Sequence, residues 1–181
     1  MFRMDVKNEL YFDAKDLLSF GSWIGRNHNY DKKTIHEGVE ATLEAKLYNW
    51  VSFLGNYTFT NAYFDGGRYS GNKIPQVPQH KASMGLRFAL FKNFTFNITG
   101  TYVGDRYFMN DQANAYSTLN SYTVADAKLM WRHKDLSASF GVGNLFNKLY
   151  SEQAGVTVDT GVKFYYPSPA RNFTFKMDYS F

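Results

Sequence analysis

Apolar and polar residues alternate strictly along much of this 181-residue chain, and few folds accommodate such a pattern. Successive side chains of a β-strand point to opposite faces, so each alternating segment has one apolar and one polar face. The clearest segment is the last one, whose apolar positions are Phe173, Phe175, Met177, Tyr179 and Phe181. The eight segments are residues 2–13, 39–47, 51–60, 81–90, 94–102, 125–132, 136–143 and 172–181. The chain is therefore predicted to be all-β, with eight strands.

Composition excludes several classes of protein. The chain has no Cys, which excludes a disulfide scaffold, Cys-based zinc sites and thiol catalysis. Its net charge of +4 comes from 20 basic and 16 acidic residues that are scattered along the chain, so no nucleic-acid partner is expected. Aromatic residues make up 19% of the chain, yet no apolar run is long enough for a transmembrane helix.

The connections between the segments alternate in length. Short connections lie at Tyr48–Asn49, Lys92–Asn93 and residues 133–135, and long connections span about 14–34, 62–79, 109–121 and 148–170. Tight connections make neighbouring strands antiparallel hairpins. Short turns on one side and long loops on the other are typical of outer-membrane β-barrels.

The apolar faces carry no Asp, Glu, Lys or Arg, so they face either a packed core or lipid. Aromatic residues at the strand ends favour lipid, since such rings suit the two membrane interfaces. Near the short turns these residues are Trp50, Phe91, Trp131 and Phe181, and towards the long loops they are Tyr63, Tyr102, Tyr107 and Tyr122. We therefore expect antiparallel transmembrane β-barrel strands, with a soluble ligand-binding β-barrel as an alternative.

Four motifs then resemble one family. Residues 144–150 (NLFNKLY) resemble a segment of the penultimate strand of TonB-dependent outer-membrane receptors, and residues 165–173 (YYPSPARNF) resemble their approach to the last strand. Residues 71–81 (GNKIPQVPQHK) and the residues from Asn29 to Glu40 are similar to entries into two other strands, and the chain ends in the family's terminal aromatic residue, Phe181. The motifs occur in the family's order, and siderophore and cobalamin receptors are the members they resemble.

The resemblance implies a barrel of about 22 strands with an N-terminal plug domain. Residues 1–181 would then be the C-terminal barrel segment and hold the last eight strands, with the plug and the earlier strands absent. The absence of a signal peptide agrees with that interpretation. The implied function is TonB-driven uptake of a ferric siderophore, or a similar nutrient such as cobalamin, across the outer membrane of a Gram-negative bacterium. The alternative is a stand-alone, closed eight-stranded barrel with a structural or adhesive role.

Candidate site residues lie in the long loops. Arg68, Tyr69, Tyr107 and Tyr116 are candidate extracellular ligand contacts, because aromatic rings and arginine suit an anionic or conjugated ligand. No catalytic residues, cofactor or metal site are expected, so the chain is not predicted to be an enzyme. The four histidines, which lie at loops or turns, are His28, His36, His80 and His133. Nothing in the sequence places paired carboxylates in an occluded pocket.

Two further roles follow from the alternation and the resemblance. The strand with Phe173, Phe175, Met177, Tyr179 and Phe181 resembles the signal read by the barrel assembly machinery. The charged residues of the polar faces would contact the plug or pair with one another in the barrel lumen. They are Glu40, Glu44, Lys46, Arg87, Asp126, Lys128, Arg132 and Lys176. The expected partners are outer-membrane lipid, the assembly machinery, the TonB complex through the plug, and a small-molecule ligand.

Overall fold

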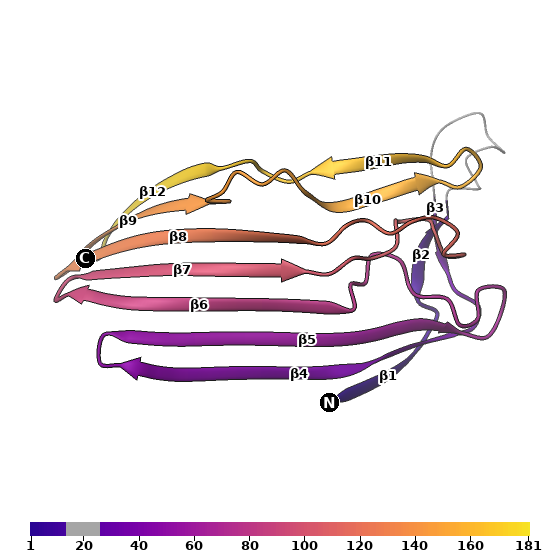
Figure 1. The fold of residues 1–181 in the computed structure, drawn as a ribbon, viewed down its shortest axis with the longest axis horizontal. Coiled ribbons are helices and arrows are strands. Elements are labelled where there is room, and N and C mark those ends of the chain that lie inside the picture. The colour runs from indigo at the N-terminus through magenta and orange to yellow at the C-terminus, as the bar shows by residue number, and fades with distance from the viewer. Residues whose placement is uncertain (14–25) are drawn as a thin grey trace.

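A computed structural model describes residues 1–13 and 26–181, and these residues form β-strands and connecting segments without a helix (Figure 1). The strands of the described residues are β1 (Phe2–Lys7), β2 (Leu10–Asp13), β3 (Arg26–Asn29), β4 (Lys33–Tyr48), β5 (Val51–Asp65), β6 (His80–Phe91), β7 (Phe94–Val103), β8 (Tyr122–His133), β9 (Leu136–Gly143), β10 (Ser151–Thr157), β11 (Val162–Pro167) and β12 (Asn172–Tyr179). Across this part of the chain, no helix has the length and apolarity needed to cross a bilayer.

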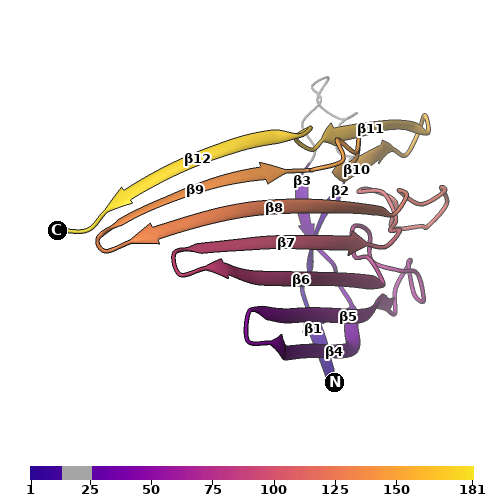
Figure 2. The ribbon, with the colours of Figure 1, turned by 60° about the vertical axis from the view of Figure 1, so that its left-hand side comes forward.

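Eight of the described strands form one sheet in the order β1-β4-β5-β6-β7-β8-β9-β12. All neighbours in this sheet are antiparallel, so the predicted all-β fold with eight antiparallel strands is confirmed. The sheet is curved and does not close within the described residues, because β1 and β12 are its two edges (Figure 2). The other four described strands form two separate hairpins, β2–β3 and β10–β11.

The strand register gathers apolar and polar residues into parallel rows across the sheet. One row of paired residues consists of Val51, Phe88, Phe96, Leu129, Phe140 and Phe175. The row one residue away consists of Ser52, Arg87, Asn97, Lys128, Gly141 and Thr174. Because adjacent residues of a strand point to opposite faces, the two rows lie on opposite sides of the sheet.

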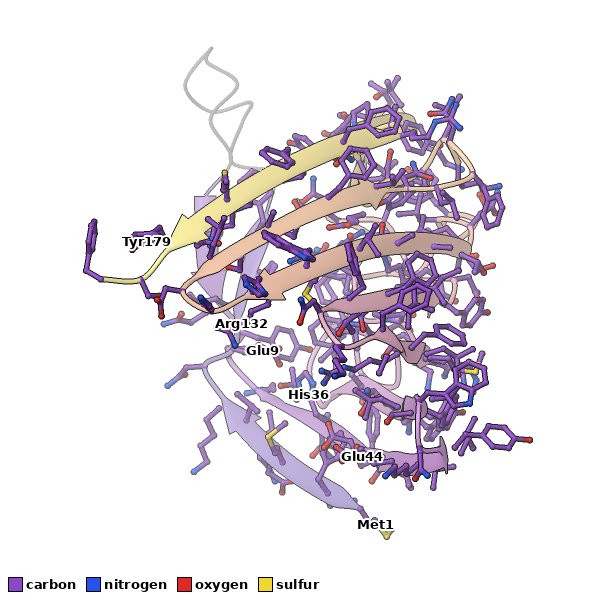
Figure 3. The ribbon with its side chains drawn as sticks, turned by 90° about the vertical axis from the view of Figure 1, so that its left-hand side faces the viewer. Met1, Glu9, His36, Glu44, Arg132 and Tyr179 are labelled. Carbon is purple, nitrogen blue, oxygen red and sulfur yellow. The ribbon has the colours of Figure 1, made fainter. Side chains whose placement is uncertain are left out.

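The polar row lies on the concave side. Residues of this row line two hollows of about 520 and 630 Å³. In Figure 3 the labelled side chains of Glu44 and Arg132 lie on the inner side of the curved sheet. The apolar residues are left on the convex face, where Met84 and Phe175 are 62% and 69% exposed. The predicted separation of the two chemistries between opposite faces is therefore present.

Short turns and long connections lie at opposite ends of the sheet (Figure 1). The β4–β5, β6–β7 and β8–β9 hairpins each turn within two residues, as the sequence predicts to within a residue. In the last of these turns Lys134 has a φ of 51°. Trp50 and Phe91 lie at the turn end and are exposed.

One expectation about the chain path was wrong. Residues 2–13 are not one strand, because Asn8 has a φ of 58° and turns the chain out of the sheet. The left-handed conformation is tolerated by Asn better than by most residues, and it ends β1. β2 then pairs with β3. The long connection over residues 148–170 is present and holds the β10–β11 hairpin. Of the connection predicted over residues 14–34, residues 14–25 lie outside the described part of the chain.

Candidate functional site

The long connections gather beyond one end of the sheet and pack on one another there (Figure 1). A small apolar cluster joins the loop between β7 and β8 to strand β10. Phe108 and Leu119 come from the loop and Ala154 and Val156 from β10; Phe108 is 1% exposed and both β10 residues are 0% exposed. Tyr116 packs against this cluster. The loop between β7 and β8 is therefore held by its own buried core rather than by the sheet alone.

Asp111 organises the tip of this loop. Its Oδ1 accepts a hydrogen bond from the main-chain N–H of Ala115 at 2.8 Å, and its Oδ2 accepts one from Tyr116 at 3.1 Å. The side chain is 1% exposed. Burial raises the pKa of this carboxyl, while the two main-chain hydrogen bonds and the nearby Lys163 act in the opposite direction.

Side-chain amides tie the loops to each other. Asn114 accepts a hydrogen bond from the main-chain N–H of Lys73 at 2.7 Å and donates one to the Lys73 carbonyl at 3.0 Å. Gln76 donates from Nε2 to the carbonyl oxygens of Tyr107 at 3.0 Å and Ala154 at 2.9 Å. Because buried carbonyls need donors, these amides satisfy the main chain where three loops meet.

Arg106 links the same loop to the start of β10. Its guanidinium donates hydrogen bonds to the carbonyl oxygens of Gly104, Ser151 and Glu152, and it lies 5.6 Å from the centre of the Tyr122 ring. Arg106 is only 4% exposed, and burial lowers the pKa of its guanidinium. A guanidinium remains charged far above neutral pH, so this cation is fixed among main-chain acceptors.

A cleft of about 160 Å³ opens beside Arg106 and Tyr107. Its other polar lining residues include Thr60, Lys73 and Asp105. Lys73 donates a hydrogen bond from Nζ to the side-chain oxygen of Asn61. Polar residues of both charges therefore line the cleft together with a tyrosine.

The structure places the four predicted ligand contacts in three surroundings. Arg68 is exposed, and its guanidinium carbon lies 5.5 Å from the centre of the Tyr69 ring. Tyr69 packs on Tyr30 and Phe64, with ring centres 6.3 and 5.7 Å away.

The other two predicted contacts belong to the loop between β7 and β8. Tyr107 lines the small cleft. Tyr116 donates a hydrogen bond from its hydroxyl to the Val158 carbonyl at 2.6 Å. Its ring packs against the apolar cluster. Arg68 and Tyr69 are thus in direct contact, whereas Tyr107 and Tyr116 share a loop and have different neighbours.

Sequence reasoning missed Arg106, Asp111 and Asn114. One signal was available for the loop, because residues 110–114 (NDQAN) are rich in the residue types that form turns by bonding their own main chain. Asn110 and Asn114 indeed have φ values of 74° and 52°. Nothing in the sequence indicates which distant carbonyls these residues meet.

The histidines lie apart from one another, and His36 belongs to a small polar cluster near the β1–β2 corner. Its Nε2 lies 3.1 Å from a Glu9 carboxylate oxygen, and Thr34 donates its hydroxyl to the same carboxylate (Figure 3). His80 contacts the Tyr57 hydroxyl at 2.8 Å, and His133 lies 3.3 Å from the Asn93 amide nitrogen. Within residues 1–13 and 26–181, no three His, Asp or Glu residues gather as metal ligands would.

The last strand has the geometry expected of an exposed edge. β12 pairs with β9 from Asn172 to Tyr179, and its other edge has no neighbour within the described residues. Phe173, Phe175, Met177 and Tyr179 are 59–69% exposed. Phe181 follows the strand and is also exposed.

Comparison with known proteins decides the family. The family model described as TonB dependent receptor-like, β-barrel matches residues 1–145. The chain belongs to this family. Members of the TonB-dependent receptor family are receptors and transporters rather than enzymes, and they reside in the outer membrane of Gram-negative bacteria.

Several known transporters and receptors resemble large parts of this chain. The ferrichrome outer membrane transporter/phage receptor of Escherichia coli K12 is 34% identical over 126 residues, which cover 62% of this chain and 16% of the relative. The ferric-catecholate import receptor Fiu of E. coli K12 matches 99% of this chain with a TM-score of 0.69 and 23% identity. The copper transporter OprC matches 99% of it with a TM-score of 0.74 and 18% identity. The chain spans only 24% and 27% of these two structures.

Proposed function

We propose that residues 1–181 form part of the barrel wall and the outer loops of a receptor that takes up a ferric siderophore or a similar nutrient. The observation that carries this proposal is the set of loops that are joined by hydrogen bonds at the end of the sheet opposite the tight turns. Main-chain carbonyls there are already satisfied by Gln76, Arg106 and Asn114, so the loop surface is ordered before a ligand arrives. Such preorganisation lowers the entropic cost of binding.

A ferric siderophore is the ligand we favour, because the relative with 34% identity is named a ferrichrome transporter. Cobalamin is the second choice, on the motif resemblance alone. The ligand contacts we propose are Arg68, Tyr69, Tyr107 and Tyr116. Arg68 and Tyr69 offer a cation beside a ring, and Tyr107 lines the small cleft. Both features suit an anionic ligand with conjugated groups.

Energy for uptake would come from TonB acting on a plug domain outside these residues, and residues 1–181 would be the last eight strands of the intact barrel. The convex face would meet outer-membrane lipid. This arrangement uses no covalent chemistry, because the ligand is bound outside, carried through the barrel and released into the periplasm.

Binding by the intact receptor tests the proposal. Purified receptor is titrated with ferrichrome, a ferric tris-catecholate and cobalamin, with binding followed by calorimetry. We expect one ferric siderophore to bind, and Tyr107→Ala to weaken it about tenfold, which corresponds to ~1.4 kcal/mol. Tyr48→Ala is the matched control, since Tyr48 is exposed at the opposite end of the sheet. Binding of cobalamin alone would refute the siderophore assignment. Uptake that persists in cells without TonB would refute the energy source.

We also propose that β12 is recognised by the barrel assembly machinery through its outward aromatic residues. Support comes from its exposed edge and from Phe173, Phe175, Tyr179 and Phe181 on or beyond that strand. Phe181→Ser in the intact receptor should lower the amount of heat-modifiable protein in the outer membrane. Tyr48→Ser, which changes an exposed ring elsewhere, should leave it unchanged.

A further inference from the structure

Tyr30, which lies between β3 and β4, packs against the start of the loop after β5. Its side chain is buried, and its ring centre lies 4.7 Å from that of Phe64 and 6.3 Å from that of Tyr69. Phe64 is also buried, and its ring centre lies 5.7 Å from that of Tyr69. The three rings therefore form one cluster on which this loop rests.

The Tyr30 hydroxyl joins the two ends of a short segment of that loop, residues 66–69. It donates a hydrogen bond to the main-chain carbonyl oxygen of Gly66 at 2.6 Å and accepts a longer one from the main-chain N–H of Tyr69 at 3.4 Å. Tyr30 is itself fixed, because its main-chain N–H donates to the carbonyl oxygen of Glu9 at 2.8 Å. A single phenol group therefore bridges the main chain on both sides of Arg68.

Residues 66–69 need such a restraint because two glycines precede Arg68. Gly66 and Gly67 have φ values of 93° and 72°, in a left-handed region that glycine adopts at little cost. The same freedom lets an unrestrained pair of glycines sample many other conformations. Gly67 also approaches the phenol closely, since an added Cβ would lie 2.8 Å from the Tyr30 hydroxyl oxygen. The Tyr30 hydroxyl therefore selects one of the conformations open to this segment.

Arg68 is the cation that this segment presents. It is exposed, and its guanidinium carbon lies 5.5 Å from the centre of the Tyr69 ring. It forms no ion pair with any residue in 1–13 or 26–181. A guanidinium that rests on an aromatic face keeps its N–H edge free, and this planar edge matches a pair of anionic oxygens. The Tyr69 ring that supports the guanidinium is in turn packed on Tyr30.

We propose that Tyr30 is a positioning residue for ligand binding. Its hydroxyl holds residues 66–69 in the conformation in which Arg68 meets an anionic group of the ligand, and its buried ring does not touch the ligand. The inference rests on the proposed function, in which Arg68 and Tyr69 contact the ligand. It adds the residue that sets their geometry in advance, which removes part of the ordering cost from the binding step.

A double-mutant cycle in the intact receptor tests this role. The probe is a ferric tris-catecholate, which carries a net negative charge, and its affinity is measured by calorimetry. Tyr30→Phe keeps the ring and removes only the hydroxyl, so we expect it to weaken binding about fivefold. In an Arg68→Ala background the same change should have almost no effect, because the group that Tyr30 positions is gone. Tyr48→Phe is the matched control and should leave the affinity unchanged, since Tyr48 is exposed at the opposite end of the sheet.

Three results of the cycle would overturn the inference. A loss of equal size in both backgrounds would show that the hydroxyl acts through the general stability of the loops rather than through Arg68. An affinity that Tyr30→Phe leaves unchanged would show that the hydroxyl has no part in binding. A receptor that binds neutral ferrichrome but not the ferric tris-catecholate would show that Arg68 meets no anionic group.

A spin label gives a second readout, which needs no ligand. Residues 1–181 contain no Cys, so Arg68→Cys introduces a single labelling site in this part of the receptor. Adding Tyr30→Phe should raise the mobility of the label, whereas adding Tyr48→Phe should not. Equal mobility in all three proteins would overturn the positioning role. A receptor that binds neither ferric ligand nor cobalamin refutes the proposed function alone, since the label still reports whether the hydroxyl holds residues 66–69.

Discussion

Gln112 donates a hydrogen bond from Nε2 to the main-chain carbonyl oxygen of Phe12 at 3.0 Å and so joins two positions 100 residues apart. The carbonyl oxygen of Gln112 accepts a further hydrogen bond, from Asn72 Nδ2 at 3.0 Å. The β2 strand, the loop after β5 and the loop after β7 therefore meet at one residue. Motion of any of these segments requires this contact to break or all three to move together.

Replacing this amide should loosen the β2–β3 hairpin without unfolding the sheet. Gln112→Ala removes one neutral hydrogen bond, worth about 1 kcal/mol. We expect amide exchange in β2 and β3 to quicken by roughly fivefold. Gln79→Ala serves as the control, because Gln79 also belongs to the loop region and its side chain makes no hydrogen bond within the described residues. Unchanged exchange in Gln112→Ala would show that the hairpin is held by other contacts.

The side-chain amide of Asn114 holds the loop after β5 by hydrogen bonds to the main chain of Lys73. Asn114 itself has a left-handed main-chain conformation. Asn114→Ala removes the two hydrogen bonds to Lys73. It also places alanine at a φ of 52°, a left-handed conformation that alanine adopts less readily than asparagine does. The expected loss of local stability is about 1–3 kcal/mol. Asn114→Gly removes the bonds and relieves the backbone, so it should be the milder change. Proteolytic nicking of residues 66–79 measures both, and equal nicking of wild type and Asn114→Ala would contradict the prediction.

The buried carboxyl of Asp111 should make loop stability depend on pH. Its pKa in the folded protein is raised above 3.8, so the folded state binds this proton more tightly than the unfolded state. Stability that is present below about pH 4 should therefore fall as pH rises through the raised pKa. Asp111→Asn removes this titration.

The measurement for Asp111 is the free energy of local opening of the loop, obtained from amide exchange corrected for the intrinsic rate at each pH. The wild type should lose protection relative to Asp111→Asn on going from about pH 3 to about pH 7. The difference in opening free energy between the wild type and Asp111→Asn could instead stay constant across this range or change in the opposite direction. Either result would show that burial does not outweigh the two main-chain hydrogen bonds in setting the pKa of Asp111.

The two faces of β12 should respond differently to the same charge. Phe175 pairs with Phe140 on the convex face, and Thr174 pairs with Gly141 on the concave face. A charged side chain facing lipid near mid-depth costs roughly 2–4 kcal/mol for Lys or Arg and less for Asp, so Phe175→Asp should measurably reduce insertion into lipid vesicles. Thr174→Asp should have a small effect, since its neighbour Lys176 provides a cation on the same face. Equal insertion of the two variants would refute the assignment of the convex face to lipid.

Much of the sheet was predictable because a single property, alternation, is repeated in every long strand. Phe175 and Thr174 point to opposite faces for the same reason that any two neighbours in a strand do. The break at Asn8 was not predictable, since Leu10 and Phe12 continue the alternation after the chain has left the sheet. The β10–β11 hairpin was hidden by three consecutive aromatic residues, 164–166, which obscure a period of two.

The loop site was harder to predict than the sheet because its contacts join residues far apart in sequence. Aromatic and Arg content alone singled out Arg68, Tyr69, Tyr107 and Tyr116, and their ligand role stays a prediction. The bonds of Arg106 to Ser151 and Glu152 depend on where a hairpin 45 residues later is placed. No local pattern reports such a meeting.

The two rows that include Phe96 and Asn97 extend across six strands and differ by one position along each of them. Inserting a single amino acid in the middle of β7 would move every later side chain of this strand to the opposite face of the sheet from its present partners on β6 and β8. Insertions and deletions among relatives should therefore accumulate in the loops and turns and be nearly absent from the strands that these connect.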